Sequence, residues 1–205
     1  MPDFSIEDEY EGIVCGADEV GRGPLAGPVV AAAVIIPKEK RDLEFIKDIK
    51  DSKKLSLKKR GYLYEQITSH LPYAICEISP AEIDEINILQ ASMKAMKVAC
   101  EKLPEINHAL IDGNKSPDLH CPTTTVVKGD AKSYTIAAAS IIAKVHRDRI
   151  MSKLNDEFPH YGWARNAGYP TKEHREALLI HGITQYHRKT FSPVRSIIDS
   201  IRKAS

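Results

Sequence analysis

Two short apolar runs joined by a glycine-rich turn constrain the fold of this chain more than any other feature. Residues 12–17 are small and β-branched, and residues 28–37 form a continuous apolar run that begins and ends at proline. Both patterns are typical of buried strands, and we expect the second strand to return beside the first. The chain therefore predicts a sheet that begins with two neighbouring strands.

Two carboxylates, Asp18 and Glu19, follow the first run directly and precede Gly21, Arg22 and Gly23. Neighbouring strand residues point to opposite faces of a sheet, so we expect the pair to share a site only where the strand frays into the turn. The glycines expose backbone N–H and C=O groups to a ligand at close range. Taken alone, the pair is equally consistent with a solvated turn after a strand.

The remaining chain predicts an α/β protein with its strands early and its helices late. Apolar alternation, N-capping serines and prolines set the element boundaries. We expect further strands at residues 73–78, 109–111 and 124–127, a helical turn at residue 80, helices at residues 56–67, 88–103, 133–158 and 172–181, an irregular segment at 159–170, and a last helix from residues 192–193. Repeats and low-complexity segments are absent from the sequence.

Length and composition indicate one domain in a reducing compartment. The chain has 205 residues, 42% of them apolar, which is enough for one substantial core. Its four cysteines form no C-x-x-C pair, so neither a zinc site nor a disulfide framework is expected. Without an 18-residue apolar run or a signal-like start, we expect a cytoplasmic protein that does not bind membranes.

Charge is distributed unevenly along the chain. Residues 1–11 contain five acidic and no basic side chains, so residues 12–205 contain 29 basic against 23 acidic side chains. We divide the chain into an acidic N-terminal tail, residues 1–11, and a single folded domain, residues 12–205, that includes the C-terminal helices. Within the domain, residues 47–60 contain seven basic and two acidic side chains. This patch is either a solvated helix face or a contact for a nucleic-acid backbone.

Four carboxylates lie at or just beyond the ends of three predicted strands, namely Asp18, Glu19, Asp112 and Asp130. Converging carboxylates repel one another unless a divalent cation neutralises them. Oxygen ligands without nearby His or Cys suit Mg²⁺ or Mn²⁺. Two such ions about 4 Å apart can activate water and stabilise the leaving oxygen of a phosphodiester. The pattern predicts a metal-dependent phosphodiesterase with two divalent ions.

The motifs together make the chain resemble the ribonuclease HII family, in its single-domain bacterial form. The resemblance extends from about residue 13 to residue 194 and has no break at a catalytic position. The segments that carry it are 16–27 (GADEVGRGPLAG), 51–56 (DSKKLS), 112–114 (DGN), 127–130 (VKGD), 137–145 (AAASIIAKV), 168–171 (GYPT) and 187–194 (HRKTFSPV).

The resemblance implies a ribonuclease H-like fold, with a mixed five-stranded sheet flanked by helices and a helical C-terminal part that helps to grip the duplex. It implies that the four carboxylates bind metal and that the backbone of residues 21–23 recognises the ribose 2′-hydroxyl, which distinguishes RNA from DNA. Tyr169 matches a tyrosine that stacks on the next deoxysugar, although a tyrosine before proline is commonly a packed loop residue. Lys53, Ser140 and Lys144 fit phosphate contacts, and the choice among the lysines stays open.

The implied activity is endonucleolytic hydrolysis of the RNA strand of RNA–DNA hybrids and cleavage 5′ of single ribonucleotides in duplex DNA, leaving 3′-hydroxyl and 5′-phosphate ends, with a role in ribonucleotide removal. We expect a monomer without an obligate protein partner. Three alternatives compete. Ribonuclease HIII carries an extra N-terminal domain, for which the 17 residues before Asp18 leave no room. The others are a four-carboxylate exonuclease and a non-catalytic nucleic-acid-binding module.

Overall fold

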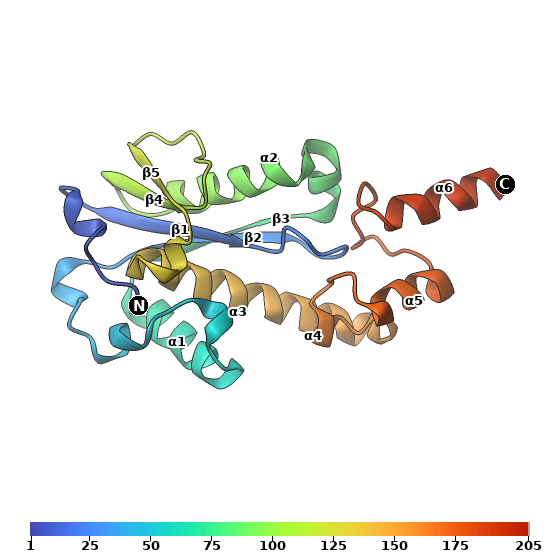
Figure 1. The fold of residues 1–205 in the computed structure, drawn as a ribbon, viewed down its shortest axis with the longest axis horizontal. Helices are drawn as coiled ribbons and strands as arrows, with labels where there is room; N and C mark the ends of the chain where they lie inside the picture. Colours follow the sequence, from blue (N-terminus) through green and yellow to red (C-terminus); the bar gives the residue numbers. More distant parts are fainter. Residues whose placement is uncertain (205) are drawn as a thin grey trace.

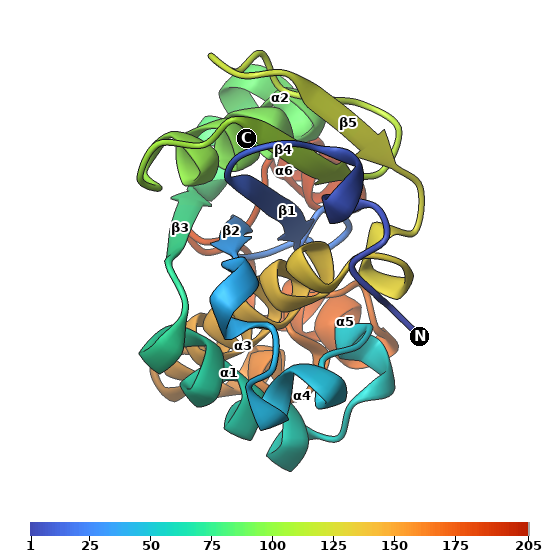
Figure 2. The ribbon, with the colours of Figure 1, turned by 90° about the vertical axis from the view of Figure 1, so that its left-hand side faces the viewer.

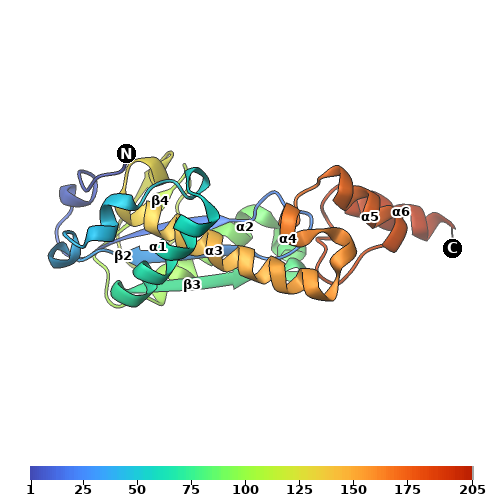
Figure 3. The same ribbon diagram turned by 90° about the horizontal axis from the view of Figure 1, so that it is seen from below.

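The computed structural model describes residues 1–204 as a sheet between two helical layers, with further helices extending from one end (Figures 1 and 3). The strands are β1 Val14–Val20, β2 Val29–Ile35, β3 Tyr73–Ile78, β4 His108–Asp112 and β5 Thr123–Val126. The longer helices are α1 Leu57–His70, α2 Pro80–Glu101, α3 Tyr134–Glu157, α5 Lys172–His181 and α6 Val194–Ala204, with a short α4 at Trp163–Asn166.

The five strands form one mixed sheet in the order β3-β2-β1-β4-β5. β2 pairs antiparallel with β1 and β3, whereas β4 pairs parallel with β1 and β5. The predicted fold, including the return of the second strand beside the first, is therefore confirmed. The two parallel pairs place the carboxyl ends of β1, β4 and β5 at one edge, where the predicted carboxylates lie.

Helices cover both faces of the sheet (Figure 2). α2 packs on one face, and α3 packs on the other with α1 outside it. The approach of α3 is close because its first turns carry alanine and β1 carries glycine at Gly16. A Cβ added at Gly16 would lie 2.4 Å from the backbone of Thr135 and Ile136. The alanine stripe of this helix thus packs against the sheet, as its sequence predicts.

The separate helical turn predicted at residue 80 and the helix predicted from residue 88 are two parts of α2. Asn87 interrupts the helix with φ 66° and ψ 162°, a backbone conformation outside the helical region. Its side-chain oxygen accepts hydrogen bonds from the N–H groups of Leu89 and Gln90. Asn87 therefore caps the second part of α2, and the predicted break is confirmed at this residue.

Two local features differ from the sequence expectations or go beyond them. The segment predicted as irregular, residues 159–170, contains a 3₁₀ turn at Pro159–Tyr161 and the short α4, both too short to show periodicity. At the N-terminus, Glu7 is buried and accepts hydrogen bonds from the hydroxyls of Ser133 and Thr135 and from the Thr135 N–H. A carboxylate there complements the N-terminal end of the α3 dipole.

The C-terminal helices enclose a second core that contains a ladder of buried aromatic and histidine side chains. His174 Nδ1 donates to the Tyr169 carbonyl, so its Nε2 accepts from Trp163 Nε1 at 3.1 Å and from His187 Nε2 at 3.1 Å. His187 Nδ1 accepts from the Thr184 N–H at 2.9 Å. Every ring nitrogen is satisfied when both histidines are neutral.

None of the helices described in residues 1–204 is long and apolar enough to span a bilayer.

We predict that acidification destabilises the protein through this ladder. Burial lowers the pKa of His187 from 6.5 to about 3, with a further contribution from His174, whose own pKa burial also lowers. Between these values the unfolded state binds a proton that the folded state excludes, so stability is lost as pH falls below 6.5. His187 alone should cost about 2 kcal/mol between pH 7 and pH 5. Thermal unfolding should then shift down by about 4–8 °C.

The control is His187→Gln, which keeps a donor toward His174 but has no titrating ring. Its melting temperature should fall less than that of the wild type over the same pH interval. Equal pH slopes for the two proteins would contradict the assignment of this titration to His187.

Candidate active site

The site is created by an offset between β1 and β4. Their parallel pairing ends at Ala17 opposite Ile111, whereas β1 continues to Val20 and stays paired with β2. The prediction that β1 frays before its carboxylates was therefore wrong. Asp18 and Glu19 reach one opening because the strand has no neighbour on the β4 side at this point.

The two faces of β1 each contribute one carboxylate to this opening. Asp18 is directed toward α3, where Ser140 lies within its hydrogen-bonding environment, and Glu19 lies beside Leu89 and Met93 of α2. Asp112, at the end of β4, adjoins both groups. Strand alternation thus does not separate Asp18 from Glu19, because the gap at the end of β4 is open to both faces.

A cleft of about 490 Å³, which we name the carboxylate cleft, brings together all of the predicted site residues. Its lining consists of Asp18, Glu19, Val20, Gly21, Arg22, Gly23, Ser52, Lys53, Asp112, Asp130, Ser140, Lys144 and Tyr169. Tyr169 is 43% exposed, and a Cβ added at Gly23 would lie 3.4 Å from its ring. The segment 21–23 and the tyrosine ring therefore lie side by side in the lining of the cleft.

In each of three carboxylates of the cleft, one oxygen accepts a hydrogen bond from a protein donor, which orients the side chain. Asp18 Oδ1 accepts from the Glu19 N–H at 2.7 Å, and Asp112 Oδ1 accepts from the Gly129 N–H at 2.7 Å. Arg22 Nη1 donates to Glu19 Oε1 at 3.2 Å. These donors leave the second oxygen of each of the three carboxylates unengaged.

Electrostatics within the cleft disfavour ionised carboxylates. Burial raises the pKa of Asp18 well above 3.8, and the charges of Asp112 and Glu19 add to the effect. Burial also raises the pKa of Glu19, against the opposing charge of Arg22. The pKa of Asp130 is raised by burial and by the carboxylate of Asp51, more than Lys53 compensates. The cleft therefore has a deficit of positive charge.

This donor set fits a hard divalent cation. The cleft offers carboxylate oxygens, its lining includes neither His nor Cys, and Asp18 is buried. Within residues 1–204, no three His, Cys, Asp or Glu side chains already lie close enough together to hold one ion. Ion binding would thus require side-chain rearrangement that brings these carboxylates closer together.

The structure adds residues around the predicted phosphate contacts that the sequence did not single out. Ser52 is buried, and its Oγ lies 2.8 Å from Oγ of Ser140. Asp51 accepts from the Lys53 N–H at 2.9 Å and so fixes the turn that carries Lys53 into the cleft. Both residues belong to the DSKKLS segment, whose short polar side chains beside a lysine were the available signal.

The predicted lysines differ in their surroundings. Lys144 is bound to Asp148 at 2.6 Å, and Lys59 of the basic patch is bound to Asp48 at 2.5 Å. Lys53 also lines the cleft, and among the basic side chains of residues 47–60 it is the one in the lining. Lys53 is consequently the stronger candidate for a phosphate contact.

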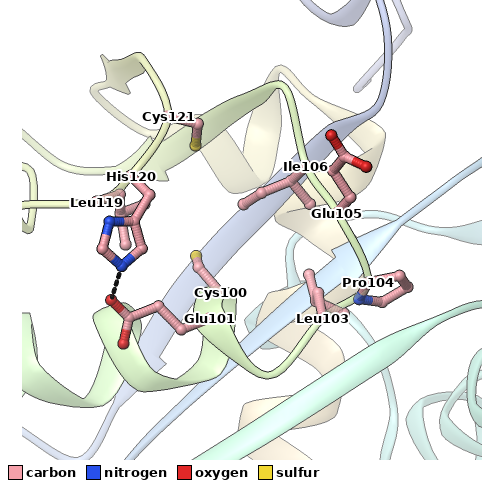
Figure 4. A pocket seen from close by; sticks show the side chains of 9 residues that line it. All are labelled: Cys100, Glu101, Leu103, Pro104, Glu105, Ile106, Leu119, His120 and Cys121. Carbon is pink, nitrogen blue, oxygen red and sulfur yellow. Dashed lines mark ion pairs between the residues drawn. The ribbon is translucent and has the colours of Figure 1, made fainter.

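A second cleft lies at the opposite edge of the sheet, where α2 ends and β4 begins (Figure 4). Two cysteines, Cys100 and Cys121, line it together with His120 and Glu101. The thiols are free, and Cys15 Sγ lies 4.0 Å from Cys100 Sγ. Burial raises the pKa of the Cys121 thiol. This cleft lacks the converging carboxylates needed for phosphodiester chemistry.

Comparison with solved structures first defines the class of protein. The chain resembles ribonuclease H2 from Pyrococcus horikoshii with a TM-score of 0.78 at 29% identity, covering 94% of this chain and 100% of that one. Ribonuclease HII of Archaeoglobus fulgidus, solved in complex with PCNA, gives a TM-score of 0.71 at 28% identity over 88% and 96% of the two chains. The fold is that of ribonucleases H.

Sequence comparison then defines the family. The ribonuclease HII family model matches residues 15–194. Ribonuclease HII of Magnetococcus marinus is 54% identical over 90% of this chain and 87% of its own length. The Wolbachia pipientis protein of that name is 51% identical over 95% and 98%. This chain belongs to the ribonuclease HII family and is a ribonuclease H endonuclease.

We predict that Asp18→Asn stabilises the metal-free protein. Because the folded-state pKa of Asp18 is raised, its ionisation costs stability as pH rises above 3.8. Asn keeps the acceptor for the Glu19 N–H and removes the charge. The melting temperature in EDTA at pH 7.5 should rise by a few degrees, since 1 kcal/mol corresponds to about 2–4 °C in a domain of this size.

Asp148→Asn provides the matched control, because Asp148 does not line the carboxylate cleft and is paired with Lys144 and Arg60. Removing that charge should lower the melting temperature. If Asp18→Asn lowers it by as much, Asp18 is not under electrostatic strain.

Proposed function

We propose that this protein hydrolyses the RNA strand of RNA–DNA hybrids and cuts duplex DNA on the 5′ side of single embedded ribonucleotides. The ends formed are a 3′-hydroxyl and a 5′-phosphate. One observation carries the proposal. The segment Gly21–Gly23, whose backbone can bind a sugar hydroxyl, lies in the same cleft as Asp18, Glu19, Asp112 and Asp130. Membership of the ribonuclease HII family supports the same reaction.

The residues divide the work as follows. The four carboxylates would hold two divalent ions, Mn²⁺ or Mg²⁺, which supply charge stabilisation and an activated water for phosphodiester hydrolysis. A ribonuclease HIII, which shares the fold at 17% identity, was solved in complex with Mn²⁺. Lys53 and the Ser140–Lys144 face would bind the phosphates flanking the scissile bond. Tyr169 would stack on the deoxysugar that follows the ribonucleotide.

The catalytic unit of this proposal is residues 12–205, which include the C-terminal helices. All proposed site residues come from one chain, which supports activity as a monomer without an obligate protein partner. Ribonuclease HII of Archaeoglobus fulgidus was solved in complex with PCNA, so a protein partner is compatible with this fold. Removal of ribonucleotides from DNA is the role that fits the proposed cleavage.

The test uses duplex DNA with one internal ribonucleotide and blocked ends, with and without Mn²⁺ or Mg²⁺. Wild type should cut at the 5′ side of the ribonucleotide only with metal. Asp18→Asn, Glu19→Gln, Asp112→Asn and Asp130→Asn should each lower the rate at least 100-fold at saturating Mn²⁺, by analogy with the loss of one charge-stabilising donor, worth about 10²–10³. Each variant removes one charge that would face the ions.

Retention of near wild-type turnover by Asp112→Asn or Asp130→Asn would remove that residue from the site. Blocked ends separate the proposal from an exonuclease, which would fail to cut this substrate. A non-catalytic binding module would show no metal-dependent product, and its affinity for the duplex would increase when the acidic residues are removed.

We predict that Tyr169 contributes through its ring. Tyr169→Ala should slow cleavage at a single ribonucleotide by roughly 5- to 160-fold, on the scale of base–aromatic stacking, which is worth about 1–3 kcal/mol. Tyr169→Phe retains the ring and should stay within about threefold of wild type, on the same scale. Single-turnover rates on one duplex measure both variants. Similar losses for Phe and Ala would assign the effect to the hydroxyl and contradict stacking.

A further inference from the structure

A buried arginine outside the carboxylate cleft binds the backbone of the segment proposed to recognise the ribose. Arg188 is 0% exposed. Its Nη2 donates to the Gly21 carbonyl at 2.6 Å, and its Nη1 donates to the Arg22 carbonyl at 3.0 Å. Nε and Nη2 both donate to the Gly27 carbonyl, at 3.1 and 2.9 Å. A guanidinium is a rigid fork that suits this set of acceptors.

The contacts of Arg188 also fix the direction of the next backbone N–H groups, because of the geometry of the peptide bond. A peptide unit is planar and trans, so the C=O of one residue and the N–H of the next point in opposite directions. With the carbonyls of Gly21 and Arg22 directed inward to Arg188, the N–H groups of Arg22 and Gly23 point outward. Within the described chain these two N–H groups have no protein acceptor. They are therefore donors presented on the wall of the carboxylate cleft.

Arg188 is itself held in place from several sides. Its N–H donates to the Leu25 carbonyl at 2.8 Å, and the Gly27 N–H donates to the Tyr186 carbonyl at 2.9 Å. The guanidinium lies over the ring of Phe191, with 5.0 Å between its carbon and the ring centroid. These contacts fix the arginine and the turn of residues 21–27 as one unit.

A second buried arginine of this region, Arg147, donates hydrogen bonds to a different set of carbonyls. Arg147 donates to the carbonyls of Pro28, Ala26 and Ala167, at 2.9, 3.0 and 2.9 Å. It anchors the far side of the turn and the base of the loop that carries Tyr169. Arg188 is the buried cation that binds the carbonyls of Gly21 and Arg22, which precede the two outward N–H groups.

We propose that Arg188 is a positioning residue for ribonucleotide recognition, because it orients the N–H groups of Arg22 and Gly23 toward the 2′-oxygen of the substrate. The inference rests on the proposed function, in which residues 21–23 bind that oxygen. Arg188 does not touch substrate. It acts by excluding the flipped peptide orientation, in which the cleft would present carbonyl oxygens that cannot donate a hydrogen bond to the 2′-oxygen. The group recognised is thus a hydrogen-bond acceptor on the ribose.

The experiment compares Arg188→Lys with wild type on two readouts. The first is kcat/KM for cleavage of duplex DNA with one ribonucleotide. The second is the inhibition constant of the matched all-deoxy duplex as a competitor. Lysine keeps the charge but lacks the rigid planar fork with which Arg188 binds the three carbonyls. We expect kcat/KM to fall at least tenfold, with the inhibition constant within twofold of wild type, because phosphate contacts are unchanged.

Ile67→Ala is the control for lost stability, since Ile67 is buried in α1 and packs in the core on the α3 side of the sheet. It should lower the melting temperature and leave both readouts within twofold. Phe191→Leu is a milder second variant, which removes the ring under the guanidinium and retains its hydrogen bonds. It should lower kcat/KM about threefold, in keeping with a cation–π contact of about 0.5–1 kcal/mol.

The outcomes distinguish failure of the positioning role of Arg188 from failure of the proposed cleavage activity. If wild type cuts the all-deoxy duplex as fast as the ribonucleotide duplex, the proposed function fails. If wild type discriminates but both readouts of Arg188→Lys change together, or neither changes, Arg188 has only a structural role. Should Arg188→Lys not fold, an unchanged kcat/KM for Phe191→Leu overturns the inference.

Discussion

The carboxylate cleft depends on the register of one pair of strands. β1 and β4 stop pairing at Ala17 and Ile111, and the continuation of β1 leaves an unpaired edge beside the end of β4. Asp18 and Glu19 point to opposite faces of β1 and share one site because this edge is open to both faces. The continued pairing of β1 with β2 keeps this edge rigid, so that acidic side chains can be held near one another.

Burying the acidic side chains in the carboxylate cleft lowers the stability of the protein, and the rest of the fold offsets this loss. The pKa of Asp18, Glu19 and Asp130 is raised in each case chiefly by burial. Arg22 and Lys53 offset only part of this carboxylate charge, and the buried guanidinium groups of Arg147 and Arg188 bind backbone carbonyls instead. The site is therefore fixed in shape and left deficient in positive charge, which suits the binding of divalent ions.

Much of this arrangement could be predicted from the sequence, because strand ends and N-caps are local signals. Ser56 and Ser133 mark the starts of α1 and α3, and the three strand-end carboxylate motifs lie where predicted. The continuation of β1 through Glu19 could not be predicted, since it depends on where a distant strand ends. Arg188 gave no signal for the same reason: its partners at Gly21 and Arg22 are more than 160 residues away.

The contact between two buried histidines could not be predicted from the sequence either. His174 and His187 are spaced without any catalytic pattern, and only the packing of the C-terminal helices brings their Nε2 atoms within 3.1 Å. Long-range packing thus decides which polar residues are buried together, whereas local sequence decides which elements exist.

The central claim is that the four carboxylates form a two-ion site, and the most direct measurement is a count of bound Mn²⁺. Electron paramagnetic resonance of free Mn²⁺ would be followed during titration of the protein with the uncut all-deoxy duplex present. The account predicts two ions per wild-type chain, both lost when Asp18, Glu19, Asp112 and Asp130 are all replaced by their amides. Equal Mn²⁺ binding by the wild type and this fourfold variant would contradict it.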